Sequence, residues 1–113
     1  MTITYSEYEL LEFFEDFPKV VDDDAKIYNY SYRDATGHIF SVSIYTYEDA
    51  VVLSISHENL SAPIIEFTLE DVSEIKVDVD KEILTITVWG EPFVQVYRKP
   101  NISIRFLKLQ PDL

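Results

Sequence analysis

The carboxylates of Asp78, Asp80 and Glu82 stand at alternate positions, a spacing that could supply oxygen ligands to a cation. A calcium loop of the EF-hand type has a glycine at its sixth position and a bidentate glutamate at its twelfth. In this chain those two positions hold Ile83 and Trp89. The segment is therefore interpreted as a solvated hairpin turn, and a metal-assisted enzyme that uses the three carboxylates is the alternative.

The two histidines, His38 and His57, are the other candidates for acid–base chemistry. No serine or carboxylate stands at a spacing from either histidine that predicts a catalytic triad. We interpret each as an ordinary hairpin residue, one at the start of a strand and one at its end. We accordingly expect a binding protein that is not an enzyme and uses neither a cofactor nor a metal.

The composition narrows the function classes further. The chain has 113 residues, of which 47% are hydrophobic and 14% aromatic, which fits one folded domain over residues 1–113. With 2 glycines and no cysteine, it lacks the residues for disulfide frameworks, thiol catalysis, zinc ribbons and glycine-rich phosphate loops. The formal net charge of -12 repels phosphate backbones, so we do not expect a nucleic acid ligand.

The sequence also predicts the cellular compartment in which the protein resides. The first residues, Met1 to Tyr5, carry no basic region, and no stretch approaches the roughly 20 apolar residues of a membrane span. We therefore expect no export signal and no membrane partner. The absence of cysteine fits a reducing compartment, and we expect a cytoplasmic protein.

Hydrophobic spacing predicts a helix over residues 6–17. Ser6 and Glu9 have the spacing of a capping box, in which a hydroxyl and a carboxylate satisfy two amides at the start of a helix. Apolar residues then recur three and four positions apart, at Leu10, Phe13, Phe14 and Phe17. Because proline disfavours helical geometry at the residue before it, we expect Pro18 to end the helix.

From residue 25 to residue 108 the hydrophobic period changes to two, which predicts strands. We expect them at about 26–33, 38–45, 51–57, 64–69, 72–79, 82–89, 93–98 and 102–107. The connections are too short for crossover helices, so the strands form an antiparallel meander. The predicted fold class is α+β: an N-terminal amphipathic helix (1–18) packed on a curved antiparallel meander sheet of about seven to eight strands. Because one short helix covers only part of such a sheet, we expect the sheet to curl towards a half-barrel or to fold over on itself.

One face of the predicted strands is apolar and forms the expected core. Its residues are Phe40, Val42, Ile44, Val51, Leu53, Ile55, Ile65, Phe67, Leu69, Ile75, Val77, Val79, Leu84, Ile86, Val88, Ile102, Ile104 and Phe106. Tyr28, Tyr30 and Tyr32 share one face of the first strand. A three-residue turn ending at Gly37 would pair Tyr32 with Phe40 and turn the tyrosines to the core. A two- or four-residue turn would expose them, and that alternative stays open.

Negative charge is concentrated at the start of the chain. Residues 1–25 hold eight acidic and one basic residue, whereas residues 91–113 hold two acidic and four basic ones. We expect the helix and the loop after it to form a surface for a positively charged protein, or else a solubility-promoting face. The candidate partner-binding residues are Glu9, Glu12, Glu15, Asp16, Asp22, Asp23 and Asp24.

A second candidate surface lies near the turn at Gly90. Trp89, Phe93 and Tyr97 stand close to Arg98, and aromatic residues with arginine are typical of protein contacts. The preferred interpretation is that Trp89 instead caps the open end of the sheet.

The acidic N-terminal helix, the long meander and the segment Phe67-Thr68-Leu69-Glu70-Asp71-Val72-Ser73-Glu74-Ile75 together resemble small acidic bacterial immunity proteins of polymorphic and contact-dependent toxin systems. The resemblance covers most of the chain in architecture, with the pattern F-x-L-E-D-V-x-x-I as its sequence part. It implies a protein that occludes the active site or substrate groove of a basic toxin domain. Interfaces vary within such families, so no functional residue is carried over.

Two hypotheses of function follow from these observations. The first is a non-enzymatic inhibitor that binds a basic protein partner, in line with the resemblance. The alternative is a carrier of a small ligand, with a cavity between the helix and the curved sheet lined by Tyr28, Tyr30 and Tyr32. Exposed edge strands could also pair across a two-fold axis, which leaves a homodimer open.

Overall fold

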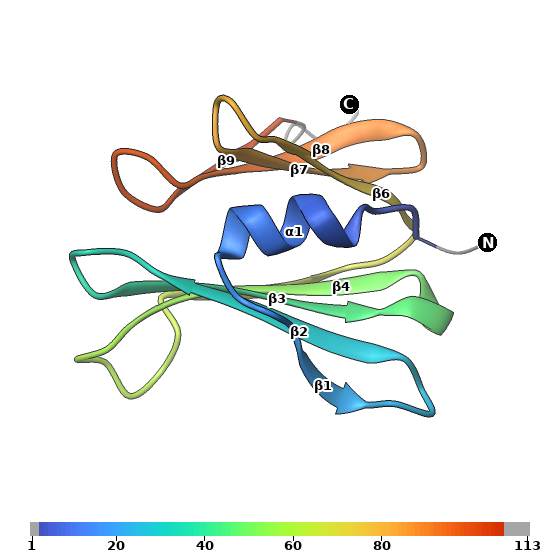
Figure 1. Ribbon diagram of the computed structural model, residues 1–113, viewed down its shortest axis with the longest axis horizontal. Coiled ribbons are helices and arrows are strands. Elements are labelled where there is room, and N and C mark those ends of the chain that lie inside the picture. Colours follow the sequence, from blue (N-terminus) through green and yellow to red (C-terminus); the bar gives the residue numbers. More distant parts are fainter. Residues whose placement is uncertain (1–2, 108–113) are drawn as a thin grey trace, which may run out of the picture.

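The computed structural model describes residues 3–107 and shows a helix held between two antiparallel sheets (Figure 1). The first sheet has the order β1 (Lys19–Asp22), β2 (Ile27–Arg33), β3 (His38–Tyr45), β4 (Ala50–His57) and β5 (Ile65–Leu69). The second has the order β6 (Val72–Asp78), β7 (Ile83–Val88), β8 (Glu91–Tyr97) and β9 (Ser103–Phe106). The helices are α1 (Glu7–Phe14) and a short 3-10 helix, η1 (Thr46–Glu48). No helix within residues 3–107 has the length and apolar character needed to cross a membrane.

The predicted α+β class with an N-terminal helix on an antiparallel meander is confirmed, and the meander folds over on itself as two sheets. The meander divides between β5 and β6, where Asp71 adopts a left-handed backbone (φ 58). The amide of Val72 then donates to the Asp49 carbonyl, so the chain leaves β5 instead of pairing with it. A ninth strand, β1, forms where a loop was expected, and it pairs with β2.

The helix begins as predicted and ends three residues early. The hydroxyl of Ser6 accepts a hydrogen bond from the Glu9 amide at 3.3 Å, which is the expected cap. The Glu9 carboxylate does not complete the capping box but accepts from the Val77 amide at 3.2 Å. Glu15 takes a left-handed backbone (φ 57), which ends the helix at Phe14 before Pro18 can act.

Helix α1 fills the open side of a sandwich. Phe14 stacks on Phe40 of the first sheet with ring centroids 5.5 Å apart, and Phe13 meets the same ring edge-on. On the opposite side the sheets contact each other directly, with Phe67 and Phe106 5.1 Å apart. Each sheet therefore buries one face, as the period of two requires. Most residues of the predicted core face are buried or packed on the core, whereas Val79 is exposed.

The turn at Gly37 sets the β2–β3 register that was predicted to turn the three tyrosines towards the core. Tyr32 pairs with Phe40, Tyr30 with Val42, and Tyr28 with Ile44. Tyr30 is buried, and Tyr28 and Tyr32 are partly buried against the core. Burial is the main reason why the pKa of Tyr30 is raised to about 12. The three tyrosines thus belong to the core face.

Candidate partner-binding site

A groove of about 490 Å³ opens beside the outer face of α1. It is lined by Glu7, Tyr8, Leu11, Phe17, Pro18 and Tyr30. Most of these side chains are apolar or aromatic, and two of them are strongly exposed: Tyr8 at 83% and Phe17 at 77%. An exposed patch of this kind, rimmed by charge, is typical of a surface that binds another protein.

The local sequence explains how the groove forms. Leu10, Phe13 and Phe14 take the buried face of α1, which leaves Tyr8 and Leu11, three residues apart, on the outer face. The left-handed Glu15 then turns the chain so that Phe17 comes beside the helix instead of extending it. Phe17 was predicted to belong to the core face, and its exposure is a correction that follows from the early end of the helix.

Strand β1 continues this exposed apolar surface. It lies at the edge of the first sheet, and all four of its residues are exposed, including Val20 at 52% and Val21 at 57%. Its pairing with β2 is irregular between Val20 and Asp22. An edge strand with apolar side chains offers both backbone groups and hydrophobic area to a partner.

The interior space that a small-ligand carrier would need is filled. Between the helix and the first sheet, Phe14 packs on Tyr30 at 5.3 Å between ring centroids as well as on Phe40. Of the three tyrosines proposed to line a cavity, Tyr30 alone is among the groove residues, and the groove opens on the surface. Within residues 3–107 the structure therefore gives no support to the carrier alternative.

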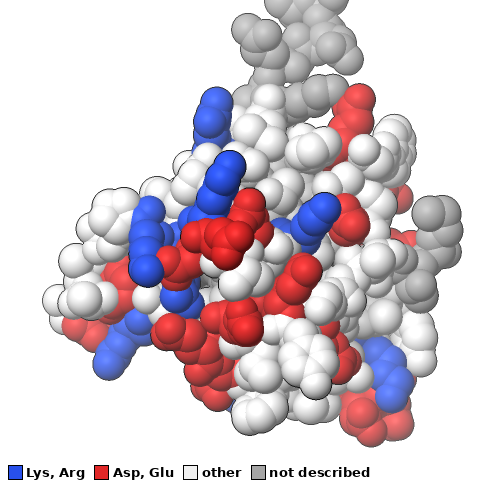
Figure 2. All heavy atoms as spheres, turned by 45° about the horizontal axis from the view of Figure 1, so that its top comes forward, with Lys and Arg blue, Asp and Glu red and all other residues white. Residues whose placement is uncertain are grey.

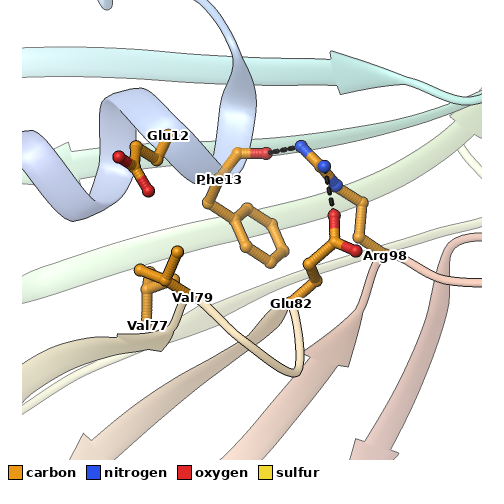
Figure 3. A pocket seen from close by; sticks show the side chains of 6 residues that line it. All are labelled: Glu12, Phe13, Val77, Val79, Glu82 and Arg98. Carbon is orange, nitrogen blue, oxygen red and sulfur yellow. Dashed lines mark hydrogen bonds and ion pairs between the residues drawn. The ribbon is translucent and has the colours of Figure 1, made fainter.

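The acidic residues predicted to bind a partner fall into two groups. The helix group is partly engaged within the molecule: Glu9 bonds to Val77, and Glu15 lies 3.4 Å from Arg98. Glu12 is exposed and lines a separate small cavity of about 150 Å³ (Figure 3). Asp16 is also exposed and accepts a hydrogen bond from the amide of the residue after it.

The second group, Asp22, Asp23 and Asp24, lies at the β1–β2 hairpin. Asp22 accepts from the Ala25 amide at 3.0 Å, and Asp23 lies 3.7 Å from Lys26. In Figure 1 this hairpin is at the lower right, away from the carboxyl end of α1. Figure 2 shows acidic and basic side chains interleaved on the face that it presents. The charge concentrated at the start of the sequence is therefore spread over two regions of the surface.

Arg98 holds the carboxyl end of α1 against both sheets. Its guanidinium donates to the Phe13 carbonyl at 2.6 Å and to the carboxylate of Glu82 (Figure 3). It also lies 4.8 Å from the ring centroid of Tyr32. The Lys99 ammonium also contacts Glu82, and these cations hold the pKa of Glu82 below its ordinary value. With its side chain only 11% exposed, Arg98 is a structural residue.

These contacts also decide between the two interpretations of the carboxylates of Asp78, Asp80 and Glu82, a hairpin turn or a metal site. Glu82 faces Arg98, and Asp78 accepts from the Lys81 amide at 3.1 Å within the turn. Over the described residues, no three His, Cys, Asp or Glu side chains come together in a way that could hold a metal ion. The segment forms the connection between β6 and β7, which is the hairpin turn that was predicted.

The two histidines meet in the structure, which the sequence analysis missed. His38 and His57 are a cross-strand pair, and their ring centroids are 4.9 Å apart. The Thr36 hydroxyl lies 2.7 Å from the Asp34 carboxylate and 2.8 Å from Nδ1 of His38. Because an ionised carboxylate can only accept, Thr36 donates to Asp34 and accepts from His38. The hydroxyl is therefore not activated as a nucleophile. The register of β3 and β4 was the signal that could have revealed this pair.

Asp34 is the centre of this cluster. Burial alone would raise its pKa, but hydrogen bonds from Thr36 and from the amides of Ile102 and His38 outweigh burial and lower the pKa to about 2. The bond to Ile102, at 3.1 Å, ties the β2–β3 turn to the start of β9. Asp34 thus joins the two sheets.

Trp89 does not cap the sheet, which corrects the preferred interpretation. It stands at the tip of the β7–β8 hairpin with 79% of its surface exposed. Phe93 is partly buried and packs against Phe106, so the candidate surface of Trp89, Phe93 and Tyr97 does not form a cluster of exposed aromatics at this turn.

Comparison with known proteins adds one finding. A chain of the solved contact-dependent growth inhibition toxin–immunity protein complex from Klebsiella pneumoniae 342 has the same fold. The TM-score is 0.66 at 20% sequence identity, and the match covers 89% of this chain and 91% of that chain. No protein-family model matches the sequence, and no curated protein matches it.

The resemblance stated from the sequence is thereby confirmed at the level of the fold. At 20% identity, what the two chains share is the arrangement of helix and strands. The groove beside α1, the exposed Trp89 and the distribution of carboxylates are features described for this chain alone.

Proposed function

We propose that this protein is an immunity protein that binds and neutralises a toxin domain. The observation that carries the proposal is the fold match over 89% of the chain to a component of a toxin–immunity complex. The groove beside α1 supports it, because Tyr8 and Phe17 expose apolar area that contributes nothing to the core. Neutralisation would follow from occlusion of the toxin's active site or substrate groove.

We further propose that the protein acts by binding and not by catalysis. The polar groups that could have served a reaction are used to hold the fold together. Thr36 and Asp34 lock a turn, and Arg98 and Glu82 fasten the end of α1. The exposed groups are, by contrast, of the types that contact other proteins.

The finer proposal is that the partner is basic. The net charge of -12 favours a positively charged protein and accelerates its approach. The contacts proposed are Glu9, Glu12, Glu15, Asp16, Asp22, Asp23 and Asp24, around α1 and the β1–β2 hairpin. Among these, all but Glu9 are exposed.

The proposal predicts that a toxin domain is encoded beside this chain's gene, and that domain is the partner to use in the test. Co-expression should restore growth, and the purified proteins should form a complex. The association rate constant should fall about tenfold or more between low and high ionic strength, because long-range attraction is screened. The double substitution Glu12→Gln and Asp16→Asn should slow association more than the control Glu66→Gln and Asp80→Asn, which removes equal charge elsewhere.

The possible outcomes test the immunity function and the electrostatic capture of a basic partner separately. Absence of both growth rescue and complex formation refutes the immunity function. A complex whose association rate is unchanged by salt, and equal for the two double variants, refutes electrostatic capture by the acidic residues.

A further inference from the structure

The turn that carries Trp89 belongs to one end of the molecule. In an antiparallel meander, alternate connections lie at the same end. The connections at residues 23–26, 46–49, 70–71 and 89–90 accordingly lie at the right-hand end in Figure 1. We name this region the aromatic end, after the side chains of Tyr47 and Trp89.

These two aromatic side chains are strongly exposed, and the backbone of Trp89 is strained. Tyr47 is 66% exposed and Trp89 is 79% exposed. Trp89 and Gly90 form a two-residue hairpin turn with φ values of 51 and 77, both left-handed. Such a turn favours asparagine before glycine, and a bulky side chain in a left-handed backbone is strained. Nothing in the packing of residues 3–107 explains why a tryptophan stands here.

The backbone at the aromatic end is held by hydrogen bonds between connections. The Val72 amide donates to the Asp49 carbonyl at 2.9 Å, and the Trp89 amide donates to the Asp71 carbonyl at 3.2 Å. The Gly90 amide donates to the Ser73 hydroxyl at 3.1 Å. Three turns from the two sheets are therefore joined, which presents Tyr47 and Trp89 on a preorganised base. Preorganisation lowers the entropy that binding must overcome.

The charge of the aromatic end indicates which kind of partner would bind there. Its four connections contain six acidic residues and one basic residue: Asp23, Asp24, Glu48, Asp49, Glu70 and Asp71, with Lys26. The four connections at the other end contain four acidic and three basic residues: Asp34, Glu58, Asp80 and Glu82, with Lys81, Arg98 and Lys99. A cationic side chain is attracted both to such carboxylates and to the face of an indole ring.

We propose that Tyr47 and Trp89 are the anchors of the toxin contact, and that a basic surface of the toxin places an arginine or lysine side chain on the Trp89 ring. This inference rests on the proposed immunity function. It assigns the strongest contact to the aromatic end, next to the β1–β2 hairpin, and adds two residues that no charge argument would select.

The experiment uses the fact that Trp89 is the single tryptophan of the chain. The protein labelled with 5-fluorotryptophan should give one fluorine resonance, which shifts and broadens when the unlabelled toxin domain from the adjacent gene is added. Trp89→Asn should weaken binding at least tenfold in calorimetry. The same variant should melt no lower than the wild type, because asparagine before glycine suits this turn.

Leu60→Asn is the matched control, since Leu60 is 55% exposed in the connection between β4 and β5 at the other end. It should leave the affinity unchanged. If the wild type binds toxin but Trp89→Asn binds equally and the fluorine resonance stays fixed, the anchor assignment is wrong while the immunity function stands. If the wild type does not bind toxin, both are wrong. Should Trp89→Asn melt lower than the wild type, the resonance of the labelled wild type decides alone.

Discussion

Replacement of Asp34 by asparagine should destabilise the protein in a pH-dependent way. The Asp34 side chain is 4% exposed and joins the β2–β3 turn to the second sheet. One carboxylate oxygen accepts from the amides of Thr36 and His38 and from the Thr36 hydroxyl, and the other accepts from the Ile102 amide. Asparagine keeps one acceptor oxygen but turns an NH₂ group towards the remaining donors, so at least one buried hydrogen bond is lost.

The magnitude follows from the pKa of Asp34. A fall from the ordinary value of 3.8 to about 2 means that the folded protein favours the ionised form. At roughly 1.4 kcal/mol per pKa unit, the carboxylate contributes about 2 kcal/mol to the free energy of unfolding at neutral pH. For a domain whose total stability is about 5–15 kcal/mol, such a loss is readily measured.

The pH dependence has a defined sign. Because the pKa of Asp34 is lowered on folding, its contribution is complete above pH 3.8 and declines as the pH falls through about 2. The difference in unfolding free energy between wild type and Asp34→Asn should therefore be about 2 kcal/mol at neutral pH and about half of that near pH 3.

Urea unfolding followed by far-ultraviolet circular dichroism measures this difference at each pH. Asp80→Asn is the control, since Asp80 is an exposed acid in a turn of the second sheet and should change stability by less than about 0.5 kcal/mol. A loss below about 0.5 kcal/mol for Asp34→Asn at neutral pH, or a loss that does not shrink towards pH 3, would refute the assignment of Asp34 as an ionised tie between the sheets.

Two further substitutions test the packing around α1. Phe14→Ala should lower the free energy of unfolding by about 3–5 kcal/mol, because Phe14 is 2% exposed and packs on the rings of Tyr30 and Phe40. A loss below about 1 kcal/mol in urea unfolding would contradict this packing. Arg98→Met should lower the free energy of unfolding by about 2–3 kcal/mol, because the Phe13 carbonyl loses a charged donor. Amide hydrogen exchange at the carboxyl end of α1 should accelerate. Unchanged exchange would argue against the role of Arg98 in holding this end of the helix.

The features that the sequence predicted correctly are those set by nearby residues. The cap at Ser6 depends on four consecutive residues, and the pairing of Tyr30 with Val42 depends on one turn at Gly37. The hydrophobic period likewise located eight of the nine strands, because each buries one face. The ninth, β1, has exposed residues on both faces and so shows no such period.

The features that were missed depend on contacts between distant segments. Glu9 completes no capping box because the Val77 amide, 68 positions away in the chain, is a nearer donor in the fold. The point at which the meander divides, between β5 and β6, is set by contacts of distant segments, such as the bond from the Val72 amide to the Asp49 carbonyl. Trp89 is exposed because the sandwich closes through Phe67 and Phe106 and leaves no open end for it to cover.

The same reasoning explains why charge along the chain and charge on the surface differ. Acidic residues that follow one another in the first 25 positions separate between the helix and the β1–β2 hairpin. Acidic residues from three connections, by contrast, lie at the aromatic end because alternate turns of a meander share an end. Asp23 and Asp24 belong to both sets, since the hairpin that carries them lies at that end. Substitution of these two residues should therefore weaken attraction of a basic partner whether the helix or the aromatic end makes the main contact. Trp89→Asn and the helix pair Glu12→Gln and Asp16→Asn discriminate between the two.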